Sequence, residues 1–311
     1  NRALVLSADG LLSADDPTFG EWSELWVNSR RGVKDTTKKQ YRYNLARAAR
    51  FFGSVKLSKL GSSHLEDMYV ELPDSGLSPT SVHQVHVNVG TCLKAAYRKG
   101  HMSRDIAALA NSPSAQKRKP IMLSRRGWKS LVDESAKSQA GLIVEFTLKT
   151  GMRIDVEALT TTWDQIDFET RSVTVGASKT AAGEGRVIPL DDGLVGRLRA
   201  LRAIHRAKQL EDEEDWNALD LVFCNSAGNR HSYQNLQRRV LEPTLVRVGL
   251  PRLTWHHLRY NCGSYLLSEN VPITAVSKIL GHANPAITMG IYAHELQEDL
   301  DQVRVAMGKF G

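Results

Sequence analysis

The chain has 311 residues, of which 41% are hydrophobic and 24% are charged, so it is long enough for two globular domains. It contains no apolar run of the roughly 18 residues that span a membrane and no signal-peptide pattern, so we expect no membrane-spanning segment. Its three cysteines are far apart and form no Cys-x-x-Cys motif. We therefore predict reduced thiols of an intracellular protein, and exclude a disulfide framework and a cysteine zinc site.

The net charge of +7 is concentrated in the first part of the chain. Residues 1–119 contain 18 Lys/Arg and 11 Asp/Glu, whereas residues 120–311 contain 23 of each. Between residues 30 and 59 there are ten basic residues and one acidic residue, Asp35. A charge run is commonly only a solvated face, but an imbalance of this size repels itself unless a polyanion is bound. We therefore predict nucleic acid as the partner.

The sequence predicts an extended leader over residues 1–15 and an all-helical domain over residues 16–110. Apolar residues recur in this domain at the spacings of 3 and 4 that one face of an α-helix requires. Residues that favour helix caps mark the helix ends. The predicted helices begin near Pro17, Asp35, Ser62 and Ser78, and the last of them ends near Gly100.

Residues 111–120 are polar, basic and bounded by proline, so we interpret them as an interdomain linker; the alternative is a surface loop within one domain. Residues 121–295 mix helical patterns with short strand patterns, which predicts an α+β domain with a small antiparallel sheet. The tail, residues 296–311, has a further apolar stripe. The predicted strands cover 163–168, 172–175 and 186–190, and the predicted helices cover 124–136, 139–150, 191–208, 232–249, 255–268, 272–280 and 284–293.

Two cations of the second domain are candidates for binding a phosphate. Thr150-Gly151-Met152-Arg153 is predicted to end one helix and open another, where a guanidinium can add to an anion site. The commoner role for such an arginine is a buried salt bridge, and Glu157 is a candidate partner. Lys179 lies in the connection between the second and third strands, where a lysine usually only keeps the sheet edge soluble. It gains a chemical role if that connection lies over DNA.

The C-terminal part supplies further donors and a nucleophile. His256 and Arg259 are three residues apart, so they share one face of a helix. His282 follows a glycine that is predicted to end a helix, and Tyr292 lies ten residues beyond it. An isolated tyrosine is more often a core residue. Together with Arg153, however, these residues supply phosphate-binding donors and an oxygen nucleophile without a metal-ligand set, which are the parts needed to break and rejoin a phosphodiester.

The order of these positions resembles the tyrosine recombinases of the phage integrase family. The resemblance covers nearly the whole chain, including the motifs around Arg153, Trp163-Asp-Gln-Ile-Asp167 and Arg186-Val-Ile-Pro-Leu190. It implies a mainly α fold with a small antiparallel sheet, in which a SAM-like core-binding domain and an α+β catalytic domain form a C-shaped clamp on DNA. It also implies the following site: Tyr292 as nucleophile, Arg153 and Arg259 as phosphate clamps, His256 as general base, Lys179 as general acid and His282 as a hydrogen-bond donor.

The resemblance implies phage-type site-specific integration or excision through a 3′-phosphotyrosyl bond and a Holliday junction, with no metal, ATP or other cofactor. The implied partners are double-stranded attachment sites, further copies of the chain in a tetramer and a DNA-bending accessory protein, in the cytoplasm of a bacterial host at its nucleoid. Basic residues of the first domain and linker are expected to contact phosphates. These are Lys38, Lys39, Arg42, Arg47, Arg50, Lys117, Arg118 and Lys119.

The sequence departs from the family pattern at two places. An acidic residue usually follows the first arginine by three positions, whereas Val156 stands there in this chain and Glu157 comes next. We attribute this to a one-residue shift of the helix that starts near Arg153. The second departure is Tyr260-Asn261, where the family often has His followed by Ser or Thr.

Three alternatives remain open from the sequence. A type IB topoisomerase shares this chemistry but only relaxes DNA. A non-catalytic architectural DNA-binding protein would carry an inert tyrosine. The tail, residues 296–311, either packs on its own domain or, as we favour, docks on a neighbouring protomer.

Overall fold

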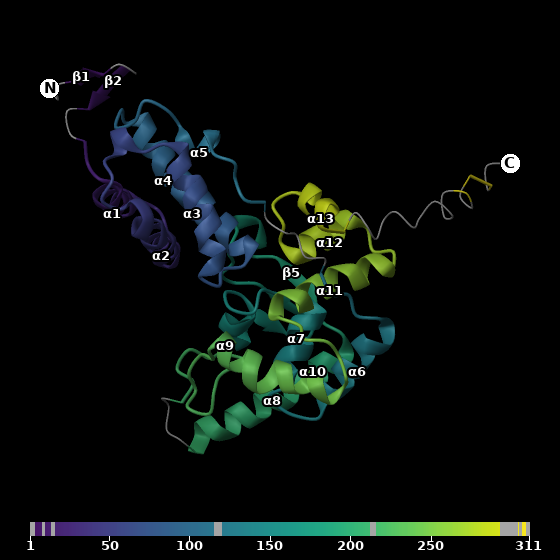
Figure 1. Cartoon of the computed structure of the whole chain (residues 1–311). Coiled ribbons are helices and arrows are strands. Elements are labelled where there is room, and N and C mark those ends of the chain that lie inside the picture. The colour runs from purple at the N-terminus through teal and green to yellow at the C-terminus, as the bar shows by residue number, and fades with distance from the viewer. Residues whose placement is uncertain are drawn as a thin grey trace. The chain divides into compact units, whose positions relative to one another are not determined.

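The computed structural model describes residues 4–7, 10–13, 16–114, 120–211 and 216–292, together with Arg304, Met307 and Gly308. The chain divides into two compact units, Asn1–Arg118 and Lys119–Gly311 (Figure 1). Three of the predicted DNA contacts, Lys117, Arg118 and Lys119, lie outside the described residues, as does most of the predicted tail.

The first unit is helical apart from a hairpin at its start. Strands β1 (Leu4–Ser7) and β2 (Gly10–Ser13) pair antiparallel within the segment that the sequence predicts as an extended leader. The helices that follow match the predicted starts closely. They are α1 (Phe19–Ser29), α2 (Asp35–Phe52), α3 (Ser62–Asp74), α4 (Pro79–Arg98) and the short α5 (Ile106–Leu109).

Local capping explains where these helices begin. The Thr18 hydroxyl accepts a hydrogen bond from the Glu21 amide at 3.3 Å, and the Glu21 carboxylate accepts one from the Thr18 amide at 2.9 Å. This reciprocal capping box satisfies two amides that the first turn leaves free. At the start of α4 the Ser78 hydroxyl accepts a hydrogen bond from the Ser81 amide at 3.3 Å, and Pro79 occupies the first helical position, where no amide hydrogen is needed.

The apolar faces of these helices meet in one core, and this packing determines which face of α2 is exposed. The rings of Phe19 and Phe52 pack edge to face with centroids 4.8 Å apart. The Trp22 indole donates to the carbonyl of Cys92 at 3.1 Å, which ties α1 to α4. Because α2 buries one side in this core, its many basic residues lie on the other side.

The second unit combines a three-stranded antiparallel sheet with helices α6 to α13. The strands are β3 (Ile166–Asp167), β4 (Ser172–Thr174) and β5 (Val187–Pro189), in the order β3-β4-β5. Val173 pairs with Ile166 on one side and Ile188 on the other, and all three are buried. The helices are α6 (Arg125–Ala136), α7 (Leu142–Thr150), α8 (Asp192–Glu211), α9 (Tyr233–Leu236), α10 (Glu242–Arg247), α11 (Trp255–Ser268), α12 (Ile273–Leu280) and α13 (Pro285–Tyr292).

Two elements of this unit differ from the prediction. The first predicted strand is shortened, because Trp163–Gln165 forms a 3₁₀ turn before β3. The helix predicted over residues 232–249 contains a π-helical segment, Gln237–Leu241, between α9 and α10. Pro243 follows this segment and has no amide hydrogen to close a regular turn, which gives a physical reason for the change.

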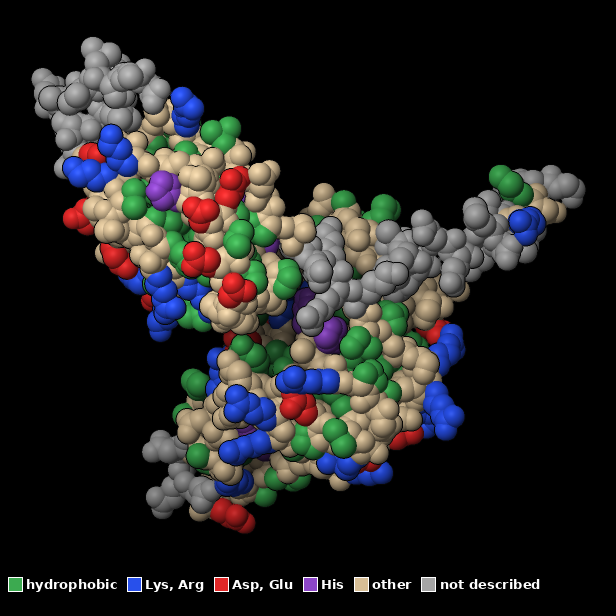
Figure 2. Space-filling view, viewed as in Figure 1, with side chains coloured by type: hydrophobic (Ala, Val, Ile, Leu, Met, Phe, Trp, Pro, Cys, Tyr) green, Lys and Arg blue, Asp and Glu red, His purple; other side chains and the backbone are tan. Residues whose placement is uncertain are grey.

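The prediction of a mainly helical protein with a small antiparallel sheet is confirmed. Among the described residues, no helix is long and apolar enough to cross a membrane. On the face shown in Figure 2, Lys and Arg side chains lie on both units and are interspersed with acidic ones.

Candidate active site

The segment after α7 is a tight turn that brings Glu157 back to Arg153. Gly151 ends α7 with φ of +63°, a conformation that glycine adopts without strain. The amide of Glu157 then donates to the carbonyl of Arg153 at 3.0 Å. The predicted helix from Arg153 is therefore wrong, since the next helical piece is a 3₁₀ turn at Ala158–Thr160. In return, the Glu157 carboxylate accepts from the Arg153 amide at 2.8 Å and from its Nη1 at 2.6 Å.

Glu157 is the anionic centre of the site. It is 1% exposed and also accepts hydrogen bonds at 2.6 Å from Arg186 Nη2 and from Ser178 Oγ. Burial alone would raise the pKa of this carboxyl, but the hydrogen bonds from Arg186, Ser178 and the Arg153 amide lower it to about 2. Glu157 is therefore charged at neutral pH and holds both arginines. The one-residue departure from the family pattern leaves an acidic side chain beside Arg153.

Arg186 is a site residue that the sequence analysis missed. Its side chain is only 3% exposed, although it opens the predicted third strand. Ile188 and Leu190 are buried as well, whereas Val187 and Pro189 are exposed. The signal was available, because residues two apart on a strand share a face and an arginine in register with two inward apolar residues must point inward.

Arg259 joins two separate segments of the site. It lies in the second turn of α11, which begins after a capping box between Thr254 and His257. The guanidinium is 4% exposed; Nη1 donates to the carbonyl of Gly151 at 2.7 Å, and Nη2 donates to the carbonyl of Leu280. Burial and the neighbouring charge of Arg153 lower the pKa of Arg259 to about 10, so it stays protonated at neutral pH.

Both predicted histidines lie among these cations. Gly281 ends α12 in the left-handed conformation, and His282 Nδ1 lies 2.7 Å from the Thr288 hydroxyl. Burial and, to a smaller extent, the charges of Arg259 and Arg153 together lower the pKa of His282 to about 4. His256 lies one turn before Arg259. Partial burial of its ring lowers its pKa, and the positive charges of the same two arginines add to this effect. Both imidazoles are therefore neutral at pH 7 and able to accept a proton.

Lys179 reaches the same cluster from the connection between β4 and β5. Its side chain is exposed, and the connection contains a 3₁₀ turn at Ala181–Gly183. The neighbouring Thr180 hydroxyl donates to the carbonyl of Gly281 at 3.2 Å, which attaches this connection to the corner before His282. The charge of Lys179 is also among those that lower the pKa of His256.

Tyr292 ends α13 and is packed against α11. It is 2% exposed, its ring stacks on Tyr260 with centroids 4.9 Å apart, and its hydroxyl donates to the Tyr260 carbonyl at 3.3 Å. Gly263 makes this packing possible, because a Cβ there would lie 2.2 Å from the Tyr292 hydroxyl oxygen. The hydroxyl is thus turned into the protein, and the ring belongs to a small apolar cluster with Val276 and Leu280.

The cluster is built to receive an anion. Its described residues include four cations, Arg153, Lys179, Arg186 and Arg259, against one carboxylate, Glu157. Guanidinium groups held by fixed acceptors and neutral imidazoles are suited to a phosphodiester. Among the described residues, no group of three or more His, Cys, Asp or Glu side chains is placed to hold a metal ion.

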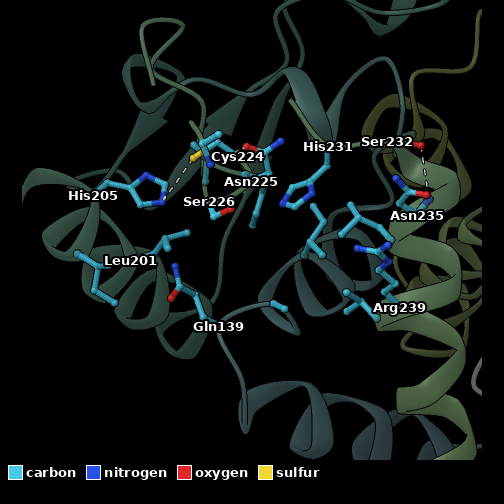
Figure 3. A pocket seen from close by; sticks show the side chains of 18 of the residues that line it. Gln139, Leu201, His205, Cys224, Asn225, Ser226, His231, Ser232, Asn235 and Arg239 are labelled. Atoms are coloured by element: carbon cyan, nitrogen blue, oxygen red, sulfur yellow. Dashed lines mark hydrogen bonds between the residues drawn. The ribbon is translucent and has the colours of Figure 1, made fainter. Parts of the chain in front are cut away.

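A cavity of about 800 Å³ lies elsewhere in the second unit and shares no residue with this cluster. Figure 3 shows His205 directed at Cys224, with His231 and Arg239 further along the wall. His205 Nδ1 accepts from the Trp163 indole at 3.2 Å, and its Nε2 lies 3.9 Å from Cys224 Sγ. These contacts hold His205 in the polar wall of the cavity against the core. They do not form a site that binds a phosphate.

The described DNA-contact candidates lie on α2, and two of them contact their own neighbours. Arg42 donates to Asn28 at 2.7 Å, and the Arg47 guanidinium lies 4.1 Å from the centre of the Tyr43 ring. The side chains are exposed or half-buried, as phosphate-binding residues must be. The members of this set are Lys38, Lys39, Arg42, Arg47 and Arg50.

Comparison with known proteins identifies the family. The model of the phage integrase family matches residues 126–299. The chain belongs to the phage integrase family. It is thereby placed among the tyrosine recombinases, enzymes of site-specific DNA recombination that cleave and rejoin DNA. The sequence-based recognition is confirmed.

Individual relatives agree with this assignment. The chain is 23% identical over 282 residues to tyrosine recombinase XerC of Shewanella amazonensis, covering 88% of this chain and 90% of that protein. The Tn1549 transposon integrase in complex with a circular intermediate DNA superposes with a TM-score of 0.76 at 16% identity, covering 95% of this chain and all of that one. A lambda integrase tetramer bound to a Holliday junction has a TM-score of 0.69 at 16% identity, covering 89% and 78%. The two structural similarities extend the fold to both units.

Proposed function

We propose that this chain recombines two double-stranded DNA sites, as in phage-type integration or excision, by transesterification at the cluster around Glu157. The observation that carries the proposal is the cluster itself, in which four segments of one unit bring cations and neutral imidazoles around a single buried carboxylate. Such a site stabilises the negative charge that develops on a phosphoryl group in the transition state.

The cleavage step assigns one role to each predicted residue. The Tyr292 oxygen bonds to the scissile phosphorus, and the bond from phosphorus to the 5′ oxygen breaks. The phenolic proton passes to His256, which is neutral at pH 7, and Lys179 protonates the leaving 5′ oxygen. The remaining residues, Arg153, Arg259 and His282, hold the non-bridging oxygens. The 3′-phosphotyrosyl bond keeps the free energy of the broken ester, so rejoining to another strand needs no nucleotide.

Tyr292 must leave its packed position before it can attack. Its hydroxyl is bonded to the Tyr260 carbonyl and buried against Gly263, so it is not presented to solvent or DNA. Movement of α13 away from α11 supplies the change. The tail, residues 296–311, begins four residues after Tyr292, and we assign it to docking on a neighbouring copy within a tetramer on two DNA sites. Deleting them should weaken the pairing of two sites more than the binding of one; equal losses would contradict this role.

We further propose that the protein acts on attachment sites in DNA at the nucleoid of a bacterial host, with a DNA-bending protein as an additional partner. The basic face of α2 supplies contacts to phosphates, which position the enzyme on the DNA without recognising its base sequence.

Covalent trapping of DNA tests the function. A library of duplexes with randomised flanks and a nick close to the cleavage point is incubated with the protein, and the molecules that survive denaturation on the protein are sequenced. The nick lets a short fragment diffuse away, so cleavage cannot be reversed. Wild type should form a covalent complex and Tyr292→Phe should form none. Tyr265→Phe is the matched control, because Tyr265 lies elsewhere on α11 and its ring stacks on Trp128 of α6.

The outcomes separate the alternatives. Trapping by Tyr292→Phe at the wild-type level would show that another residue is the nucleophile. Relaxation of supercoiled DNA without exchange between two selected sites would indicate a topoisomerase. Binding without any covalent complex would indicate an architectural protein.

A further inference from the structure

Arg186 lies buried between three segments of the second unit. Its Nη2 donates to Glu157 Oε2 at 2.6 Å, its Nε donates to the carbonyl of Ile279 at 2.8 Å, and its Nη1 donates to the carbonyl of Gly183. All three nitrogens of the guanidinium are therefore committed to protein acceptors. With a side chain only 3% exposed, Arg186 acts on the reaction through other residues.

Each of its three acceptors belongs to a segment that carries a proposed catalytic group. Glu157 holds Arg153 through two hydrogen bonds. Gly183 closes the connection between β4 and β5, which carries Lys179. Ile279 lies in the last turn of α12, three residues before His282. Arg186 therefore fixes the spacing of three groups that come from distant parts of the sequence.

The Lys179 connection lies directly on the corner at Gly281. A Cβ on Gly281 would be 2.7 Å from the Gly183 Cα and 3.0 Å from Arg186 Nη1. The Thr180 hydroxyl adds a second attachment to the Gly281 carbonyl at 3.2 Å. The connection is thus held next to Lys179 by Thr180 and at its far end by Arg186.

We propose that Arg186 is the positioning residue for Lys179, so that protonation of the leaving 5′ oxygen depends on it. The inference rests on the proposed function. The effect is selective for the general acid, because the other two groups keep contacts of their own when Arg186 is removed. Arg153 keeps its two bonds to Glu157, and His282 keeps its contact with Thr288. The exposed Lys179, in contrast, depends on the connection that Arg186 holds. A lysine at this position cannot substitute, since one ammonium lacks the planar fork that reaches three acceptors in fixed directions.

The test compares an oxygen and a sulfur leaving group in the duplex selected by covalent trapping. In both duplexes the Tyr292 oxygen bonds to phosphorus and its proton passes to His256. With the natural 5′ oxygen, the bond from phosphorus to oxygen breaks and Lys179 supplies a proton. With a bridging 5′ sulfur, the bond from phosphorus to sulfur breaks and the thiolate leaves unprotonated, since a thiol has a pKa of about 8.5. The sulfur duplex therefore removes the need for Lys179 alone.

Single-turnover cleavage should show the selectivity. Arg186→Met should slow cleavage of the oxygen duplex about 10²-fold and of the sulfur duplex less than about tenfold, the range that a lost general acid produces. Arg186→Lys should behave like Arg186→Met. On the oxygen duplex, a variant carrying both Lys179→Ala and Arg186→Met should cleave no more slowly than Lys179→Ala alone, because the two residues act in one step.

Arg197 provides a matched control outside the cluster. Like Arg186, it pairs with a buried carboxylate, Glu145, and donates to backbone carbonyls, those of Ser135 at 2.9 Å and Ser138 at 3.2 Å. Arg197→Met should lower the melting temperature to a similar degree. Any effect on cleavage should be equal for the two duplexes.

Equal slowing of both duplexes by the Arg186 variants, or additive losses in the double variant, would overturn the inference. If Arg186→Met does not fold, Arg186→Lys decides the same comparison, since it keeps the buried charge. Failure of the proposed function looks different: wild type would form no Tyr292 complex, or Lys179→Ala would show no preference for the sulfur duplex.

Discussion

The basic face of α2 and the cluster around Glu157 are both rich in arginine, yet they organise it differently. On α2 the arginines are exposed or half-buried and contact neighbours such as Asn28 and Tyr43. In the cluster, Arg186 and Arg259 are almost fully buried and each donates to acceptors on distant segments. An exposed cation binds a phosphate wherever it meets one, whereas a buried cation is fixed before the phosphate arrives. The first arrangement suits affinity and the second suits catalysis.

The largest predicted contrast comes from making an Arg→Lys substitution in each of the two regions. Arg259→Lys should lower single-turnover cleavage of the selected duplex by about 10²–10³-fold, because one ammonium cannot donate to the carbonyls of Gly151 and Leu280 and also hold a phosphate. Arg42→Lys should leave the rate near wild type, since a phosphate accepts a point charge. Comparable losses in the two variants would remove the distinction between the regions.

Carboxylates give the second contrast. Glu157→Gln should lower the free energy of unfolding by about 3 kcal/mol, because it leaves the buried Arg186 and the half-buried Arg153 without their anion. Glu24→Gln should have little effect, since Glu24 is exposed and lies 3.6 Å from Arg42. Thermal or urea unfolding of the two variants measures the difference. Equal stabilities would mean that Glu157 does not organise the cluster.

Salt dependence gives a third and smaller contrast. Lys39→Ala and Arg50→Ala should each weaken DNA binding several-fold and reduce the slope of log affinity against log salt by about 0.9, for specific and random duplexes alike. Lys179→Ala should leave that slope closer to wild type. Binding titrations at several salt concentrations test this, and an unchanged slope in both α2 variants would exclude α2 from the phosphate contacts.

The smallest predicted effect is on the pH dependence of stability. The pKa of His282 falls from its ordinary 6.5 to about 4 in the folded protein, so the unfolded chain binds the proton more readily. Stability should therefore decline as the pH falls from 6.5 towards 4, and His282→Asn should flatten this decline. Glu157, with its pKa lowered from 4.5 to about 2, adds a further loss only below pH 4.5. A decline identical in wild type and His282→Asn would show that burial and the cationic neighbours do not lower the pKa of His282.

The departures from the family pattern have structural counterparts in this chain. Tyr260 stacks on Tyr292, so the residue after the second arginine contributes to the packed position of the proposed nucleophile. Asn261 accepts from the amide of Leu123 at 2.6 Å and donates to the carbonyl of Ile121 at 2.9 Å. It therefore fixes the start of the second unit to the helix that carries Arg259.

The sequence by itself determined the helices and the small sheet, because capping and periodicity are local properties, and its residue order predicted the six candidate site residues. It placed the helix from Trp255 to Ser268 and the strand around Val173 closely. It mispredicted the segment at Arg153, where a tight turn closed by an ion pair with the buried Glu157 replaces the expected helix. Only the tertiary structure showed Arg186 as a centre of that site and Tyr292 turned inward. Strand alternation can indicate that Arg186 points inward, but the acceptors of both side chains lie on segments about 30 to 90 residues away, which no local pattern encodes.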